Sequence, residues 1–322
     1  MTRQTQRQKG ISMVLVTGAT GMSGQLAVRE FVRMGTPVRA LVRNLARADA
    51  AGLTKLPGVD LVVGDMRQPG TLGTALEDIE RVLMISGAAP DMRETQCNFI
   101  DACKAAGVRH VVKFSGGEPG FDPTTFRFTR MHEEIEDYLE GSGLAWTHLR
   151  PSQFMQVYLR EAPDIMATGT LRLPFGNISL SPIDAEDIAK IAYRLLRDGG
   201  HEGESLDMTG PEALKMNEIA ARISASIGKP VKYVSITPEE RRRDLLDRGL
   251  PEDFVDALDE QTEERLRHPV AKVLMATHQM FGVQPTWFAD FTQKHADKLG
   301  GWRPKEADRA HQSRLAPRGG MQ

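Results

Sequence analysis

Short apolar runs alternate with longer amphipathic stretches over the first half of the chain. Six runs predict strands because they are rich in Val, Ile and Leu and most end at Gly, Arg or Asp; they span 13–18, 37–43, 59–65, 81–87, 110–116 and 145–151. The stretches between them have helical spacing, as in 24–35, where Gly35 would cap the helix. Strands that alternate with helices form a parallel sheet covered on both faces. The pattern therefore predicts an α/β fold of the doubly wound, Rossmann type.

The alternation loosens after residue 151. The second half mixes short strand-like runs with helices, and helical spacing predominates over 238–299. We therefore expect a Rossmann domain over 12–151, followed by a smaller mixed α/β, largely helical substrate-binding region. This region spans 152–302, with strand and helix returns to the Rossmann core. The two ends, 1–11 and 303–322, contain few large apolar residues and are expected to be disordered tails.

Composition narrows the class of protein. The 322 residues include 41 Lys and Arg against 43 Asp and Glu, so no general basic field exists to collect nucleic acid or anionic lipid. No apolar run is long enough for a signal peptide or a membrane span. Cys97 and Cys103 point away from each other on one predicted helix, so neither a disulfide nor a metal site is expected. We expect a cytoplasmic monomer or homodimer that binds no metal, no membrane and no nucleic acid directly.

Three glycines follow the first predicted strand in the segment VTGATGMSG. Gly18 allows a sharp turn off the strand, Gly21 allows the backbone to approach a pyrophosphate, and Gly24 allows the next helix to pack against the strand. The N–H groups that open this helix would then face the phosphates. The segment predicts a dinucleotide site formed by Gly18, Ala19, Thr20, Gly21, Met22, Ser23 and Gly24.

The end of the second predicted strand indicates which dinucleotide binds. NAD-binding proteins place an acidic residue there to accept from the ribose 2′-hydroxyl, whereas this chain has Arg43. A guanidinium suits a 2′-phosphate, so the sequence predicts NADP(H). Arg47 is a candidate second contact, although a solvated surface charge is the better interpretation for it.

The ends of two further predicted strands are expected to line the crevice that holds the dinucleotide. Asp65 would lie near the adenine amino group, with Met66 packing on the ring. Ser86 and Gly87 would line the ribose and pyrophosphate with small residues. These four residues are therefore expected to contact the cofactor.

These motifs, together with FSG at 114–116 and SGLAWTHLRPSQFMQ at 142–156, resemble those of the atypical short-chain dehydrogenase/reductases, specifically the NmrA-like branch. The resemblance continues through PIDAEDIAKIAYRLL at 182–196 and covers nearly the whole chain. It implies an NAD(P)-binding protein in which Phe114, Ser115, His132 and Pro151 also contact the cofactor. The branch contains NADPH-dependent reductases of quinones, dyes and other small aromatics, and also redox sensors that bind NADP(H) and turn nothing over.

The chain departs from the pattern of the superfamily at the catalytic pair. That pair is Tyr-x-x-x-Lys on the helix after the fifth strand, with a Ser at the strand end; here Ser115 is present but the helix reads FTRMHEEIE. Aligning Glu136 with the usual downstream Glu places His132 at the Lys position and Phe128 at the Tyr position. The acidic side chains of this helix, Glu136 among them, are expected on a solvated face.

The sequence leaves three interpretations of this departure. His132 could donate a proton or hydrogen-bond the ribose, because its ordinary pKa near 6.5 suits acid–base work at neutral pH. A quinone-like acceptor could instead take hydride directly and collect its proton from water. In the third interpretation the site is catalytically empty and senses NADP(H).

Aromatic and sulfur-containing side chains gather in the sequence near the expected nicotinamide end. They suggest a flat apolar pocket for a small-molecule substrate, with contacts from Phe121, Phe128, Phe154 and Met155. We therefore expect an NADPH-dependent oxidoreductase that transfers hydride to a small acceptor, such as an aromatic or quinonoid molecule, with His132 and Ser115 as candidate catalytic residues. The alternative is a non-catalytic NADP(H)-sensing regulatory protein.

Overall fold

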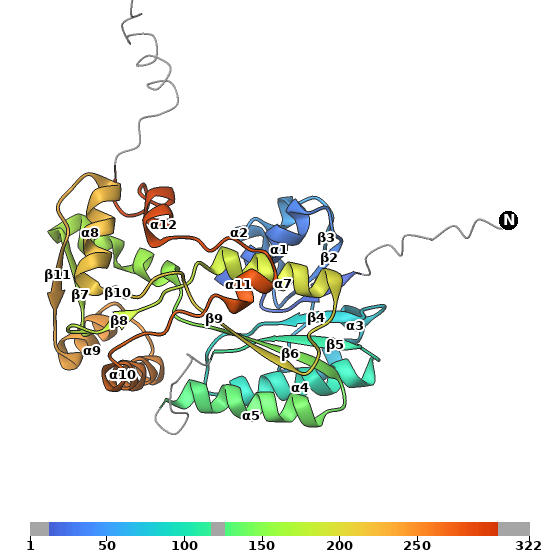
Figure 1. Ribbon diagram of the computed structural model, residues 1–322. Coiled ribbons are helices and arrows are strands. Elements are labelled where there is room, and N and C mark those ends of the chain that lie inside the picture. Colours follow the sequence, from blue (N-terminus) through green and yellow to red (C-terminus); the bar gives the residue numbers. More distant parts are fainter. Residues whose placement is uncertain (1–12, 117–125, 302–322) are drawn as a thin grey trace, which may run out of the picture.

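A parallel sheet of seven strands runs through the centre of the computed structural model, which describes residues 13–116 and 126–301 (Figure 1). The strand order is β3-β2-β1-β4-β5-β6-β9, and every neighbouring pair is parallel. The bounds are β1 Val14–Val16, β2 Val38–Val42, β3 Val59–Val63, β4 Arg81–Met84, β5 His110–Phe114, β6 Ala145–Pro151 and β9 Glu204–Met208. The order reverses between β1 and β4, which opens a crevice at the carboxyl ends of these strands. The predicted α/β fold is confirmed.

Helices cover both faces of this sheet, as Figure 1 shows. One face carries α1 (Met22–Arg33), α2 (Leu45–Ala50) and α7 (Ala185–Asp198); the other carries α3 (Gly73–Leu76), α4 (Met92–Ala105) and α5 (Arg127–Gly141). Short 3-10 helices, η1 (Leu53–Lys55) and η2 (Pro69–Thr71), lie in the connections. Side chains alternate across each strand, so Val111 packs in the core beneath α4 and α5 while Val112 packs in the opposite core.

The seventh strand was not among the six that the hydrophobic pattern predicted. β9 pairs with β6 from Thr147–Glu204 to Pro151–Met208, although it comes from the second half of the chain. Its apolar residues alternate with polar ones at the edge of the sheet, a pattern that does not distinguish this sheet from a separate one. Because α7 also packs on α1, both a strand and a helix of the second half of the chain lie against the Rossmann core.

The second region has a core of its own between two small sheets and several helices. β7 pairs in parallel with β11, and β8 pairs antiparallel with β10. The strands are β7 Thr170–Leu173, β8 Ser179–Leu180, β10 Leu214–Lys215 and β11 Lys232–Ser235. The helices are η3 Met155–Glu161, α6 Ala162–Thr168, α8 Met216–Ile227, α9 Pro238–Asp247, α10 Glu252–Arg267, α11 Ala276–Met280 and α12 Phe288–Lys294. The expected tails, 1–11 and 303–322, lie outside the described residues.

Candidate functional site

At two positions of the glycine loop between β1 and α1, another part of the backbone lies too close for a side chain. Gly18 has φ +57°, and a Cβ there would lie 2.7 Å from the carbonyl oxygen of Ile85. A Cβ on Gly24 would lie 2.2 Å from the carbonyl oxygen of Gly18, so this glycine packs against the turn itself. Gly21 differs from both, because it is exposed at the N-terminus of α1 and no side chain caps that terminus. The loop therefore presents the first N–H groups of α1 to an anion.

Arg43 directly follows β2 and is exposed, as is Arg47 one turn further on. Within residues 13–116 and 126–301 neither guanidinium forms an ion pair with a carboxylate. Asn44 caps α2, since its Oδ1 accepts from the N–H of Ala46 at 2.7 Å. A cation without a carboxylate partner at this strand end fits a 2′-phosphate.

The other expected cofactor contacts lie on the same edge of the sheet but differ in how much of their surface is exposed. Asp65 is half-buried and accepts from the N–H of Arg67 at 3.0 Å. Met66 is only 7% exposed and packs in the hydrophobic core, so it offers little surface to a ring. Ser86 Oγ accepts from Gln96 Nε2 at 2.8 Å, and Gly87 is exposed.

A buried lysine connects two of the candidate catalytic residues. Lys113 lies in the middle of β5 with none of its surface exposed, and its Nζ donates to Ser115 Oγ and to His132 Nδ1, each at 2.8 Å. Lys113 and Ser115 share one face of the strand because they are two residues apart, and α5 brings His132 over that face. Sequence reasoning missed Lys113; the signal was a single lysine inside the apolar run HVVKF.

Burial sets the charges within this group. It lowers the pKa of Lys113 to about 7, and the negative charge of Glu136 opposes part of that shift. Burial, together with the charge of Lys113, holds the pKa of the His132 imidazole well below its ordinary value. His132 is therefore neutral and accepts from Lys113, which removes the ordinary pKa that made it a candidate acid.

The inner face of α5 continues this polar layer along the sheet. Glu136, one turn after His132, is buried and accepts from the Nε and Nη2 of Arg150 on β6. Burial raises the pKa of Glu136, but the hydrogen bonds from Arg150 and Ser115 outweigh it and leave the pKa lowered. The expected solvated position of Glu136 is wrong, because helical periodicity alone does not distinguish an acidic residue that pairs inside from one that faces water.

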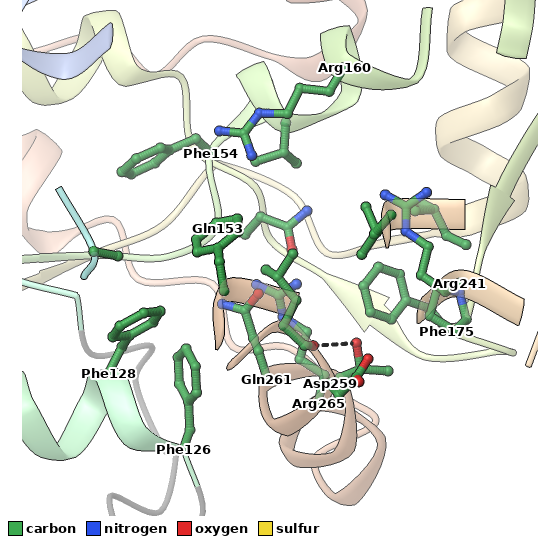
Figure 2. A pocket seen from close by; sticks show the side chains of 18 of the residues that line it. Phe126, Phe128, Gln153, Phe154, Arg160, Phe175, Arg241, Asp259, Gln261 and Arg265 are labelled. Carbon is green, nitrogen blue, oxygen red and sulfur yellow. Dashed lines mark hydrogen bonds between the residues drawn. The ribbon is translucent and has the colours of Figure 1, made fainter. Parts of the chain in front are cut away.

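A cavity of about 530 Å³ opens beside Ser115. Its inner end is lined by Ala88, Ser115, Gly116 and Pro151. Figure 2 shows Phe126 and Phe128 on one side of this end and Phe154 on the other, while Phe175 and Arg241 lie at the far end. The rings of Phe126 and Phe128 meet edge to face with centroids 5.7 Å apart. The walls suit a flat apolar molecule.

The expected substrate contacts divide into three groups. Phe128 and Phe154 line the cavity. Met155 does not line it, because its side chain is fully buried in the core of the second region. Phe121 lies outside the described residues. The remaining expected cofactor contact on β5, Phe114, packs edge to face on Phe154 with centroids 5.9 Å apart.

The outer wall of the cavity was not predicted. It comes from α9 and α10, including Leu245, Phe254, Leu258, Gln261 and Arg265. Each of these residues looks like an ordinary helix-face residue in the sequence, so only the packing of the helices identifies it as part of the site.

The described residues contain neither a candidate membrane span nor a candidate metal site. No helix in this part of the chain combines the length and apolar character needed to cross a membrane. Nor do three or more His, Cys, Asp or Glu side chains in it form a group that could hold a metal ion.

Comparison with known proteins identifies a matching family and several similar proteins. The family model described as "NmrA-like family" matches residues 11–290. An NAD(P)H azoreductase of Xenophilus azovorans is 35% identical over 288 residues, which cover 89% of this chain and 99% of that protein. A structure of the NADPH-dependent quinone oxidoreductase QOR2 of Escherichia coli complexed with NADPH has a TM-score of 0.76 and 26% identity, covering 88% of this chain and 99% of that one.

A negative transcriptional regulator shares the fold as well. The crystal structure of NmrA in complex with NADP has a TM-score of 0.73 and covers 89% of this chain and 95% of that one. Its identity to this chain is 18%, so the likeness concerns the fold alone. With the family match extending over most of the sequence and over all seven strands of the sheet, the chain belongs to the NmrA-like family.

Proposed function

We propose that this protein is an NADPH-dependent oxidoreductase that reduces a small aromatic or quinonoid acceptor. The observation that carries the proposal is the position of the aromatic cavity. Its inner end is lined by Ala88, which follows β4, and by Ser115 and Gly116, which follow β5. Ligands of open α/β sheets bind at the carboxyl ends of the strands, so an acceptor in this cavity would lie next to the dinucleotide crevice.

The cofactor is NADP(H). The loop from Gly18 to Gly24 would hold the pyrophosphate at the N-terminus of α1, and Arg43 would pair with the 2′-phosphate. The azoreductase of Xenophilus azovorans is an NAD(P)H azoreductase, and the quinone oxidoreductase of Escherichia coli is NADPH-dependent. When bound, NADPH supplies a hydride, and the protein supplies the apolar surroundings and the proton.

The cavity selects a flat acceptor. Phe126, Phe128 and Phe154 surround its inner end with aromatic surface, which stacks on planar rings and keeps water away from the reacting atoms. Phe128 stands where the superfamily has its tyrosine and has no hydroxyl to donate. Reduction therefore depends on an acceptor that takes a hydride without the usual tyrosine acid.

A panel of quinones, azo dyes, aldehydes and enones, with NADPH absorbance as the readout, tests this function. We expect NADPH consumption with the planar acceptors. Leu258→Trp should fill the cavity and raise KM or abolish turnover while NADPH affinity stays unchanged, because Leu258 lines the cavity on α10. The matched control is Leu246→Trp, since Leu246 lies 37% exposed on the neighbouring helix α9. Equal kinetics of the two variants would contradict the cavity as the acceptor site.

The second candidate is an NADP(H) sensor without turnover. The observation in its favour is Phe128, which removes the usual acid of the superfamily. Tight NADPH binding with no consumption across the whole panel would favour this sensor over the reductase.

A further inference from the structure

Lys113 has no place in the proposed hydride transfer, yet two hydrogen bonds fix its amine next to a residue that lines the cavity. Its Nζ lies 2.8 Å from Ser115 Oγ, and Ser115 lines the inner end of the cavity. A second hydrogen bond, 2.8 Å to His132 Nδ1, holds the amine from the other side. A lysine is rarely left without exposed surface unless it is paired or used.

We propose that Lys113 is a positioning residue that delivers a proton through Ser115 to the acceptor as the acceptor is reduced, and that His132 fixes the amine on this path. The inference rests on the proposed reductase function. Ser115 is the catalytic residue, because it is the member of the group that faces the cavity.

The surroundings of Lys113 favour loss of its proton. The groups that face it are Cys97 from α4, Ser115 from β5, His132 and Glu136 from α5, and His148 and Arg150 from β6. Glu136 is the single carboxylate among these groups, and it also binds Arg150. Burial therefore outweighs the attraction of Glu136, and the pKa of Lys113 falls to about 7. An amine with this pKa gives up a proton readily at neutral pH.

The neighbouring histidine acts as an acceptor only. Its pKa lies well below the ordinary value because of burial and the charge of Lys113, so the imidazole is neutral and its Nδ1 receives an N–H bond. A Cβ on Gly116 would lie 2.6 Å from the Nε2 of this ring, which shows how closely the strand end encloses it. His132 thus holds the Nζ in position toward Ser115.

The protons and electrons of the step balance. The acceptor gains two electrons and one hydrogen as hydride from NADPH, which becomes NADP⁺. The Ser115 O–H bond breaks as its proton, which bonds to Glu136 at rest, passes to the reduced acceptor. An N–H bond of Lys113 breaks as its proton passes to Ser115 Oγ. Water that enters after the product leaves returns one proton to the neutral amine along the same path.

A pH profile of kcat tests this path. The wild type should be fastest below pH about 7 and should slow as the pH rises through the pKa of Lys113. Lys113→Met should lower kcat about 100-fold and flatten the profile, with KM for NADPH nearly unchanged. Ser115→Ala, a smaller change to the packing, should flatten the profile in the same way. Lys104→Met is the control, because Lys104 is exposed on α4.

A second readout does not depend on turnover. In protein labelled with ¹⁵N-lysine, one Nζ signal should titrate near pH 7 in the wild type and in Lys104→Met, and it should be absent from Lys113→Met. If the signal that is absent from Lys113→Met titrates near pH 10 in the wild type, the inference is overturned even when the enzyme is active. An active Lys113→Met with the wild-type profile would overturn it as well. If the Nζ signal titrates near pH 7 but no acceptor is reduced, the reductase function fails, and the relay that rests on it fails with it.

Discussion

The Arg43 guanidinium is exposed at the end of β2, and no carboxylate in the described part of the chain pairs with it. The hydrogen bond from Arg67 lowers the pKa of Asp91, and the positive charge of Arg43 adds a smaller effect in the same direction. A cation that is not engaged in an ion pair costs little to redirect toward a phosphate. We therefore expect the choice between NADPH and NADH to depend on Arg43.

Replacement of Arg43 by Ala should weaken NADPH binding about 10- to 100-fold and leave NADH binding unchanged. The loss corresponds to about 1.5–3 kcal/mol for a hydrogen bond to a charged group. Calorimetric titration of both cofactors measures it. Arg47→Ala is the matched control, because Arg47 is equally exposed but lies one turn further into α2. An equal loss of NADH and NADPH affinity would remove Arg43 from 2′-phosphate recognition.

In the unit formed by β1, the glycine loop and α1, the glycines serve two different purposes. Gly18 and Gly24 contact each other, and the carbonyl of Gly18 leaves no room for a Cβ on Gly24. The nearest atom to a Cβ on Gly21 would be 3.2 Å away, and Gly21 has φ −79°, which any residue can adopt. We therefore infer that Gly24 is required for the fold and Gly21 for the ligand.

Gly21→Val and Gly24→Ala should fail in different ways. Gly21→Val should abolish dinucleotide binding while it lowers the free energy of unfolding by no more than about 1 kcal/mol. Gly24→Ala should lower that free energy by about 1–3 kcal/mol or more, because the new methyl group overlaps the backbone. Denaturant unfolding and cofactor titration of both variants separate the effects. Full cofactor affinity in Gly21→Val would refute the proposed approach of the pyrophosphate.

The distance in sequence between residues that meet in the folded molecule explains which parts of the site the sequence could predict. Local signals were enough to place the glycine loop between β1 and α1 and Arg43 at the end of β2, because strand ends and glycine spacing are features of neighbouring residues. The contacts of these residues with a dinucleotide stay predictions. Lys113 was missed because its role depends on α5 lying over β5. Leu258 was missed because α10 closes the cavity from more than 100 residues further along the sequence. β9 was not among the six predicted strands for the same reason, because it pairs with β6 across about 50 intervening residues.

We propose that the two regions together form one reductase site, with the dinucleotide on the sheet and the acceptor in the cavity. A single-turnover experiment without oxygen tests it most directly: one equivalent of NADPH is bound to the protein, and a planar quinone is then added. We expect the NADPH absorbance to disappear in step with reduction of one equivalent of quinone. Leu258→Trp should bind NADPH equally well but slow this decay. Bound NADPH that stays reduced in the presence of every planar acceptor would rule out a reductase site of this kind.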